Sequence, residues 1–228
     1  MKDKKHRHCC LWPVIALILV ASVRAVDKRD VIDYYWRNAT RAYAAHDPVR
    51  AGQTLAFTAT ASVNQLSRGA KVRHTDTTVN RYYYSGNQLD SVVFVLGKKP
   101  PLFPVDVVVL NIFDSTYVRT LFPNDRGEGE LAIGFDTDSL ADPRPAGIVT
   151  IDRNQYTMRR LHVVYHGKPG FVRFSRSFHF VSVGEWVVAD SIVETGALRG
   201  FLVNEDYQIA ISISDISIED RSIPGAGK

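Results

Sequence analysis

The sequence predicts a mainly β protein with one N-terminal helix, an α+β chain built around about eleven short antiparallel strands. Three observations predict this class. Only one segment, between Asp27 and Asp47, has the apolar spacing of a long helix. The segments after it are short, rich in β-forming residues and separated by turn signals. No later segment supplies the helix that a crossover between parallel strands requires.

Residues 1–25 have the features of a secretory signal peptide. Residues 2–8 are rich in Lys, Arg and His, residues 11–23 form an apolar run, and cleavage is expected after Ala25. As a helix the run would span about 20 Å, which is short for a hydrocarbon core of roughly 30 Å. An uncleaved anchor is the alternative. Cys9 and Cys10 precede the run, so the mature chain would contain no cysteine for disulfides, zinc–thiolate sites or nucleophilic catalysis.

The composition is that of an ordinary globular protein, with 45% apolar and 23% charged residues. It excludes a disordered chain, a collagen-like repeat and a multi-span membrane protein. The net charge of +4 belongs to the leader, because removing residues 1–25 leaves 23 basic and 23 acidic residues. The rest of the chain therefore has no basic excess that would favour nucleic acid as a partner.

The predicted helix begins near Asp27, a suitable N-cap, and ends before Asp47-Pro48. Its apolar residues recur at spacings of three and four, which puts Ile32, Trp36, Ala39 and Tyr43 on one face. This face must be covered by another part of the chain.

The predicted strands follow one another to residue 218 with no linker that would divide the chain. We therefore expect a single domain over residues 26–221 and a disordered tail over residues 222–228. The strands are predicted over residues 55–63, 79–84, 91–96, 105–113, 116–122, 131–135, 148–151, 157–165, 171–181, 185–194 and 207–218.

Two segments show which sheet faces are apolar. Within residues 171–181 the even positions include Phe174, Phe178 and Phe180, whereas the odd positions are mostly polar. Residues 207–213 alternate in the same way. Such a sheet is wet on one side and apolar on the other, and with one helix to cover it the sheet must curl. A barrel, a half-barrel and a sandwich all satisfy this requirement.

The last third of the chain resembles the periplasmic lipoprotein carriers of the LolA/LolB-like superfamily (outer-membrane lipoprotein-sorting proteins). The sequence GIVTID at 147–152 followed by MRRL at 158–161 is similar to the family's strand, aspartate turn and arginine-bearing strand. Residues 174–180 followed by VGEWVVADS at 183–191 are similar to a strand, a glycine turn and the next strand, and residues 207–218 to the closing strand.

The resemblance implies a strongly curved, unclosed antiparallel barrel with an apolar concave face and the helix as part of a lid. It also implies a noncatalytic, monomeric protein of the periplasm and cell envelope, without cofactor, that carries acyl chains of lipoproteins or lipids between membranes for outer-membrane biogenesis. Membrane-bound donor and acceptor proteins would be transient partners. The sequence departs from the family in two ways: it has a long strand pair over residues 105–122, and it shows no second lid helix. Both departures count against the carrier role more than against the fold. The alternative is an envelope binding or scaffold protein of the same fold, with a self-filled core and a protein partner.

The candidate lipid contacts are large apolar residues of the strands. Burying one acyl CH₂ contributes about 0.8 kcal/mol, so apolar surface alone can hold such a ligand. The same residues could equally pack an ordinary core. The candidates are Phe57, Phe94, Leu110, Ile112, Phe174, Phe178, Phe180 and Trp186.

Other polar patterns predict no catalytic or metal site. His162 and His166 would lie about 13 Å apart on a strand, too far to share an ion. An enzyme would require Asp136, Asp138 and His162 to gather at one pocket. The arginines of the late strands are expected in solvent, but one that points inward would meet a lipid headgroup or carbonyl; these are Arg159, Arg160, Arg173 and Arg176.

Overall fold

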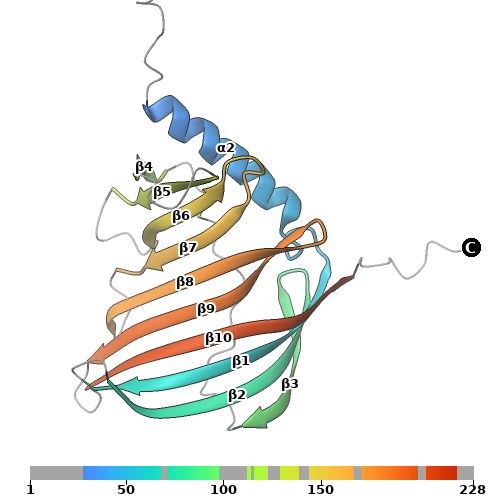
Figure 1. The fold of residues 1–228 in the computed structure, drawn as a ribbon, viewed down its shortest axis with the longest axis vertical. Helices are drawn as coiled ribbons and strands as arrows, with labels where there is room; N and C mark the ends of the chain where they lie inside the picture. The colour runs from blue at the N-terminus through green and yellow to red at the C-terminus, as the bar shows by residue number, and fades with distance from the viewer. Residues whose placement is uncertain are drawn as a thin grey trace, which may run out of the picture.

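A computed structural model describes residues 28–67, 71–97, 112–113, 116–122, 129–138, 144–166, 171–199 and 204–219. The expected leader, the C-terminal tail, Leu110 and most of the strand expected over 105–113 lie outside these residues. Figure 1 shows one curved sheet with one helix lying across it. No helix among the described residues is long and apolar enough to cross a membrane.

The helix and ten strands are bounded as follows: α2 (Lys28–His46), β1 (Thr54–Leu66), β2 (Val72–Ser85), β3 (Gln88–Gly97), β4 (Val118–Leu121), β5 (Glu130–Asp136), β6 (Ala146–Asp152), β7 (Met158–Val164), β8 (Phe171–Val183), β9 (Trp186–Arg199) and β10 (Asn204–Glu219).

The ten strands form a single antiparallel sheet in the order β3-β2-β1-β10-β9-β8-β7-β6-β5-β4. The first and last strands, β1 and β10, pair with each other as the third and fourth strands from the β3 edge. The edges of the described sheet are β3 and β4, so the sheet curls without closing (Figure 1). The predicted class is confirmed, with ten described strands where about eleven were expected.

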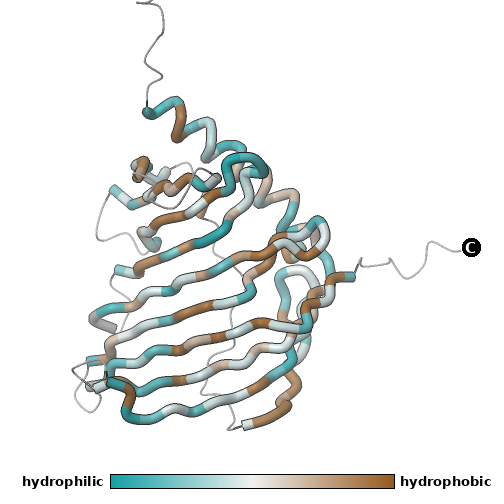
Figure 2. Tube along the Cα trace, viewed as in Figure 1, coloured by the Kyte–Doolittle hydropathy of each residue, from teal (hydrophilic) through white to brown (hydrophobic). Residues whose placement is uncertain are grey.

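One row of paired residues crosses nearly the whole sheet and defines its inner face. The row runs from Leu121 on β4 to Thr78 on β2, and most of its side chains are buried. In strand order its members are Leu121, Ile133, Val149, Leu161, Phe178, Ile192, Ile211, Ala61 and Thr78. Hydrophobic residues recur along the strands in Figure 2, as expected for a sheet with one buried face.

Helix α2 covers part of this inner face, as its apolar stripe predicts. Ile32, Trp36 and Ala39 are buried, and the Trp36 ring packs against Phe135 of β5 with centroids 6.1 Å apart. The helix ends at His46, directly before Asp47-Pro48. The last two residues expected in the strand over 105–113 differ from the prediction. Ile112 and Phe113 are outside any strand and buried, because Phe113 packs edge-on against Trp36 at 5.1 Å.

The turn between β6 and β7 is built around Asp152. Its Oδ1 accepts the backbone N–H groups of Asn154 and Gln155, both at 2.9 Å, and its Oδ2 pairs with Arg159 at 2.9 Å. Burial would raise the pKa of Asp152, but the hydrogen bond from Gln155, the guanidinium of Arg159 and the hydrogen bond from Asn154 together hold it below its ordinary value of 3.8. The turn presents Tyr156, at a φ of 59°, to the helix.

Replacing Asp152 with alanine is expected to lower Tm by about 2–6 °C at neutral pH, because the turn loses its hydrogen bonds and ion pair. Since the pKa of Asp152 is lowered by folding, its stabilisation is complete above 3.8 and disappears as the pH falls through the lower value of the folded state. The difference in Tm between wild type and Asp152→Ala should therefore shrink below pH 4. Thermal melts from pH 2 to 7 measure this difference. Asn154→Ala is the control, because it keeps the backbone N–H that bonds to Asp152. A difference in Tm between wild type and Asp152→Ala that did not depend on pH would contradict the account.

Candidate ligand-binding face of the sheet

Aromatic rings of the inner face pack near the point where the helix ends and strand β1 begins. Phe57 on β1 stacks on Tyr82 of β2, with ring centroids 5.2 Å apart and planes 12° apart. Phe180 on β8 stacks on Phe178 at 6.2 Å. All four rings are at least nine-tenths buried. The aromatic side chains that could hold an acyl chain are thus packed among themselves in this conformation.

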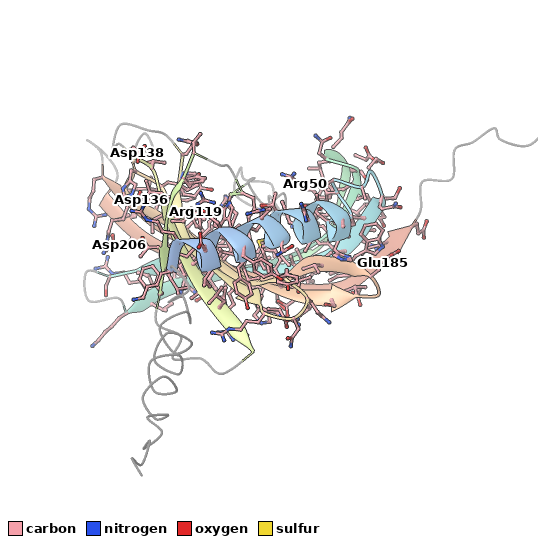
Figure 3. The ribbon with its side chains drawn as sticks, turned by 90° about the horizontal axis from the view of Figure 1, so that it is seen from above. Arg50, Arg119, Asp136, Asp138, Glu185 and Asp206 are labelled. Carbon is pink, nitrogen blue, oxygen red and sulfur yellow. The ribbon has the colours of Figure 1, made fainter. Side chains whose placement is uncertain are left out.

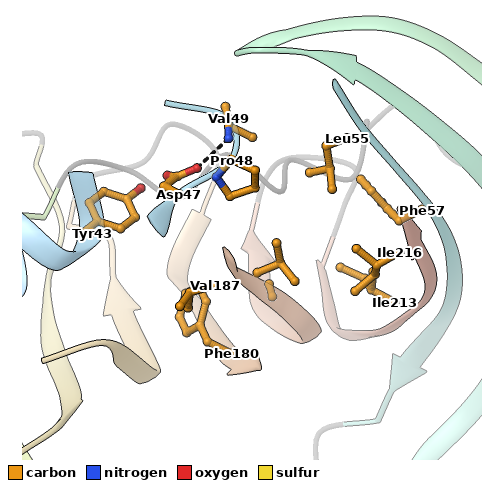
Figure 4. Close-up of a pocket in the computed structure, with 12 residues that line it drawn as sticks. Tyr43, Asp47, Pro48, Val49, Leu55, Phe57, Phe180, Val187, Ile213 and Ile216 are labelled. Carbon is orange, nitrogen blue, oxygen red and sulfur yellow. Dashed lines mark hydrogen bonds between the residues drawn. The ribbon is translucent and has the colours of Figure 1, made fainter. Parts of the chain in front are cut away.

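A small cavity remains between the end of α2 and the strands (Figure 4). Its volume is about 30 Å³, which is room for about two water molecules. An acyl chain is far larger, so the cavity would have to widen by movement of its walls. Its lining is mostly apolar and comprises Tyr43, Asp47, Pro48, Val49, Leu55, Phe57, Phe180, Val187, Val188, Ala189, Ile213 and Ile216.

The polar side chains of Tyr43 and Asp47 line the end of this cavity next to the helix. Asp47 accepts a hydrogen bond from the backbone N–H of Val49 at 2.9 Å (Figure 4) and lies 3.8 Å from Arg50. The Arg50 guanidinium lies 4.6 Å from the centre of the Tyr43 ring. Burial raises the pKa of Tyr43, and the Asp47 carboxylate raises it further. Tyr43 therefore stays a neutral phenol at physiological pH, between the apolar cavity and the charged turn.

Polar contacts attach α2 to the sheet at both of its ends. Near its start, Asp33 pairs with Arg119 of β4 at 3.3 Å, and the Tyr34 hydroxyl lies 2.8 Å from that of Tyr156. At its end, the His46 ring nitrogen lies 2.8 Å from the backbone oxygen of Glu185, in the β8–β9 turn. Figure 3 shows Arg119 beside the first half of the helix and Glu185 near its other end. These attachments are exposed, so each contributes little to the stability of the closed arrangement.

An ion pair lies on the inner face of β8 between Phe178 and Phe174. Arg176 on β8 and Glu194 on β9 are cross-strand partners, with Arg176 Nε 2.7 Å from Glu194 Oε2. The Tyr207 hydroxyl of β10 donates to Glu194 Oε1 at 2.9 Å. The inner face therefore changes along β8 from aromatic residues near the helix to an ion pair about four residues away.

The structure brings together some of the predicted contact residues and separates others. Phe57, Ile112, Phe178 and Phe180 belong to one buried cluster, whereas Phe174 is buried farther along β8. Phe94 lies on the edge strand β3 and is 46% exposed. Trp186 is half-buried at the β8–β9 turn and is not among the residues that line the cavity. Leu110 is outside the described residues.

The sequence did not lead us to predict that Arg176 and Glu194 form an ion pair. Strict alternation in β8 puts the even-numbered Arg176 on the same face as Phe174 and Phe178, and this signal was available in the sequence. Its partner depends on the β8–β9 register, which the β-bulge opposite His179 and Phe180 shifts by one residue. A bulge of this kind has no clear sequence signature here.

The other polar candidates lie apart. His162 is exposed on β7, with its Nδ1 2.8 Å from Ser177 Oγ, and Asp136 is exposed at the end of β5. Among the described residues, no three His, Cys, Asp or Glu side chains gather as a metal site would require.

Comparison with known proteins finds similarity only among solved structures. No protein-family model matches the chain, and no curated protein matches it. A LolA superfamily protein from Nitrosomonas europaea is 9% identical, with a TM-score of 0.37 over 85% of this chain and 94% of that one. A putative outer membrane lipoprotein-sorting protein domain from Vibrio parahaemolyticus is 10% identical, with a TM-score of 0.42 over 80% of this chain and 91% of that one.

A chain of the Pseudomonas aeruginosa MucA/MucB complex is 11% identical, with a TM-score of 0.28 over 81% of this chain and 97% of that chain. The solved structures that match thus include the superfamily that the sequence resembles. At these identities and TM-scores the similarity concerns the fold alone.

Proposed function

We propose that this protein is an exported, noncatalytic binding protein that takes up the acyl chains of lipoproteins or lipids on the inner face of its sheet. Its place would be the periplasm, after cleavage of residues 1–25, and its role would be to carry such ligands between membranes. The contact residues would be the buried cluster around Phe57, Phe178 and Phe180 together with the cavity beside Tyr43.

The observation that carries the proposal is the continuous apolar face beneath helix α2. Eight of the nine residues in the row from β4 to β2 are apolar, and one helix with Ile112 and Phe113 packs against this cluster. Movement of α2 would expose this face as a groove. Burial of about sixteen methylene groups there could contribute about 13 kcal/mol, which would act against the loss of the helix contacts.

A buried group under α2 also favours a helix that can move. The Trp36 indole Nε1 is buried without a hydrogen-bond partner among the described residues. Burying an unpaired N–H costs about 1–3 kcal/mol in the closed arrangement. Displacement of the helix would return this donor to water or to a ligand oxygen.

The fluorescence of Trp36 tests the proposal directly. In a Trp186→Phe variant cleaved after Ala25, Trp36 would be the only tryptophan. Titration with a palmitoylated peptide is expected to change its emission in a saturable way, because the ligand displaces the helix from the sheet. The same peptide without the acyl chain is expected to leave the emission unchanged.

A matched variant controls for nonspecific effects. In Trp36→Phe the remaining Trp186 lies at the β8–β9 turn, outside the cavity lining, and its emission should change little. An equal response to both peptides, or no response to either, would argue against acyl-chain binding.

A second candidate is an envelope scaffold with a self-filled core and a protein partner. The exposed strand β3, which is largely hydrophobic in Figure 2, favours it. Its exposed residues are Val92, Val93, Phe94, Val95 and Leu96, at 42–66%. Such a scaffold is expected to bind neither the palmitoylated peptide nor the same peptide without its acyl chain, and to bind a protein partner instead.

A further inference from the structure

We infer that Arg176 is a recognition site for the ester or amide carbonyl of the acyl ligand. The inference rests on the proposed function and extends it by placing the polar end of the ligand. The apolar tail would lie toward Phe178 and the cavity beside Tyr43, and the carbonyl would accept a hydrogen bond from the Arg176 guanidinium.

The strand register places Arg176 on the ligand face. It is paired with Val163 of β7 and Glu194 of β9, and it lies two residues from both Phe174 and Phe178. Phe178 is buried in the apolar cluster, whereas the Arg176 side chain is 21% exposed. A ligand that followed β8 away from the helix would therefore meet its first charged group at Arg176.

The guanidinium is held with donors to spare. Its Nε donates to Glu194 Oε2 at 2.7 Å, and its centre lies 5.4 Å from the centroid of the Phe174 ring. Within the described part of the chain, neither of its terminal nitrogens has a hydrogen-bond partner. An arginine carries five N–H donors, so at least two are available to a ligand.

The Glu194 carboxylate is held by a third strand. The Tyr207 hydroxyl donates to its other oxygen at 2.9 Å. The Tyr207 ring lies across Gly196, where a Cβ would come within 2.3 Å of the ring. Burial and the Glu194 carboxylate raise the pKa of Tyr207, which keeps the hydroxyl protonated as a donor. Arg176, Glu194 and Tyr207 thus form a fixed cluster on the inner face, flanked along β8 by Phe178 and Phe174.

The charge of this cluster selects a neutral acceptor over an anion. Glu194 already neutralises Arg176, and its carboxylate would repel a second anion such as a phosphate. A carbonyl oxygen is neutral and needs only a donor. Next to the cluster, a cleft of about 430 Å³ lined by Phe174, Gly196 and Tyr207 among others leaves room for the rest of a headgroup.

Two lipids that differ only in the carbonyl test this inference. The probes are 1-monopalmitin, a glyceryl ester, and 1-O-hexadecylglycerol, the corresponding ether. Each is used to displace the apolar dye N-phenylnaphthylamine from the exported protein cleaved after Ala25. Wild type is expected to bind the ester at least about tenfold more tightly than the ether, as for one hydrogen bond from a charged donor. Arg176→Met is expected to bind the two equally.

Arg176→Met leaves Glu194 without its cation and can reduce stability, so a second variant is needed. The double variant Arg176→Met/Glu194→Met replaces the ion pair with apolar residues of similar length, a change that folded proteins commonly tolerate. It too should bind ester and ether equally. The control Arg160→Met removes an exposed arginine of β7 and should keep the wild-type preference.

The outcomes separate the two proposals. If wild type binds both lipids with equal affinity, the role of Arg176 is overturned and acyl-chain binding stands. If the double variant keeps the preference for the ester, the role of Arg176 is likewise overturned. If wild type displaces no dye with either lipid, acyl-chain binding fails, and the carbonyl site fails with it.

Discussion

Replacing Trp36 with alanine is expected to lower the free energy of unfolding by about 3–5 kcal/mol. Trp36 is 3% exposed and its ring packs against Phe113 at 5.1 Å and Phe135 at 6.1 Å. Its loss leaves a cavity between α2 and the sheet at the point where the helix, the β5 strand and Phe113 meet. In a chain of this size Tm should fall by roughly 10 °C.

Denaturant unfolding followed by circular dichroism measures this effect, with Trp186→Ala as the matched control. Trp186 is half-buried at a hairpin turn, so its truncation should cost much less. If the two variants were equally stable, Trp36 would not anchor the helix to the sheet. If α2 is the part that moves, added palmitoylated peptide should raise the Tm of Trp36→Ala by more than that of wild type, since the helix is already loosened.

Replacing Gly147 with alanine is expected to destabilise the protein by about 3 kcal/mol, at the upper end for an overpacked core. A Cβ at this position would lie 2.0 Å from the backbone oxygen of His162 and 2.9 Å from Cζ of Phe135. The first clash is with backbone of the paired strand β7, which a side-chain rotation cannot relieve. The pairing of β6 with β7 would have to shift or open.

Gly129 provides the control for this substitution. A Cβ there would meet no atom within 4 Å, and its backbone does not have a positive φ. Gly129→Ala should therefore leave Tm unchanged or slightly higher. Thermal melts of the two variants side by side make the comparison. A Gly147→Ala protein as stable as wild type would show that the strands can separate locally at little cost.

The elements were largely predictable because their local signals are strong. The spacing of Ile32, Trp36 and Ala39 gave the helix face, and Asp47-Pro48 gave its end. Alternation in residues 171–181 gave the buried face of β8. These signals depend on neighbours within a few residues along the chain, so an isolated sequence carries them.

The candidate site was only partly predictable, because it depends on register and on exposure. Phe94 and Phe178 are both aromatic strand residues, but Phe94 is 46% exposed at a sheet edge and Phe178 is 6% exposed beneath a helix. Their different exposure follows from the order of the strands, since β3 is an edge strand and β8 lies inside the sheet. The pairing of Arg176 with Glu194 depends on a bulge in β9, and the sequence does not mark where that bulge lies.

Native mass spectrometry tests the central claim, acyl-chain binding, most directly. The full sequence would be expressed in a bacterium with an outer membrane, and the exported protein purified from the periplasm without detergent. The account predicts the mass of residues 26–228 accompanied by lipid-sized adducts that disappear on solvent extraction and return when acylated peptide is added. A single unliganded mass that stays unchanged when lipid or acylated peptide is titrated in would contradict it.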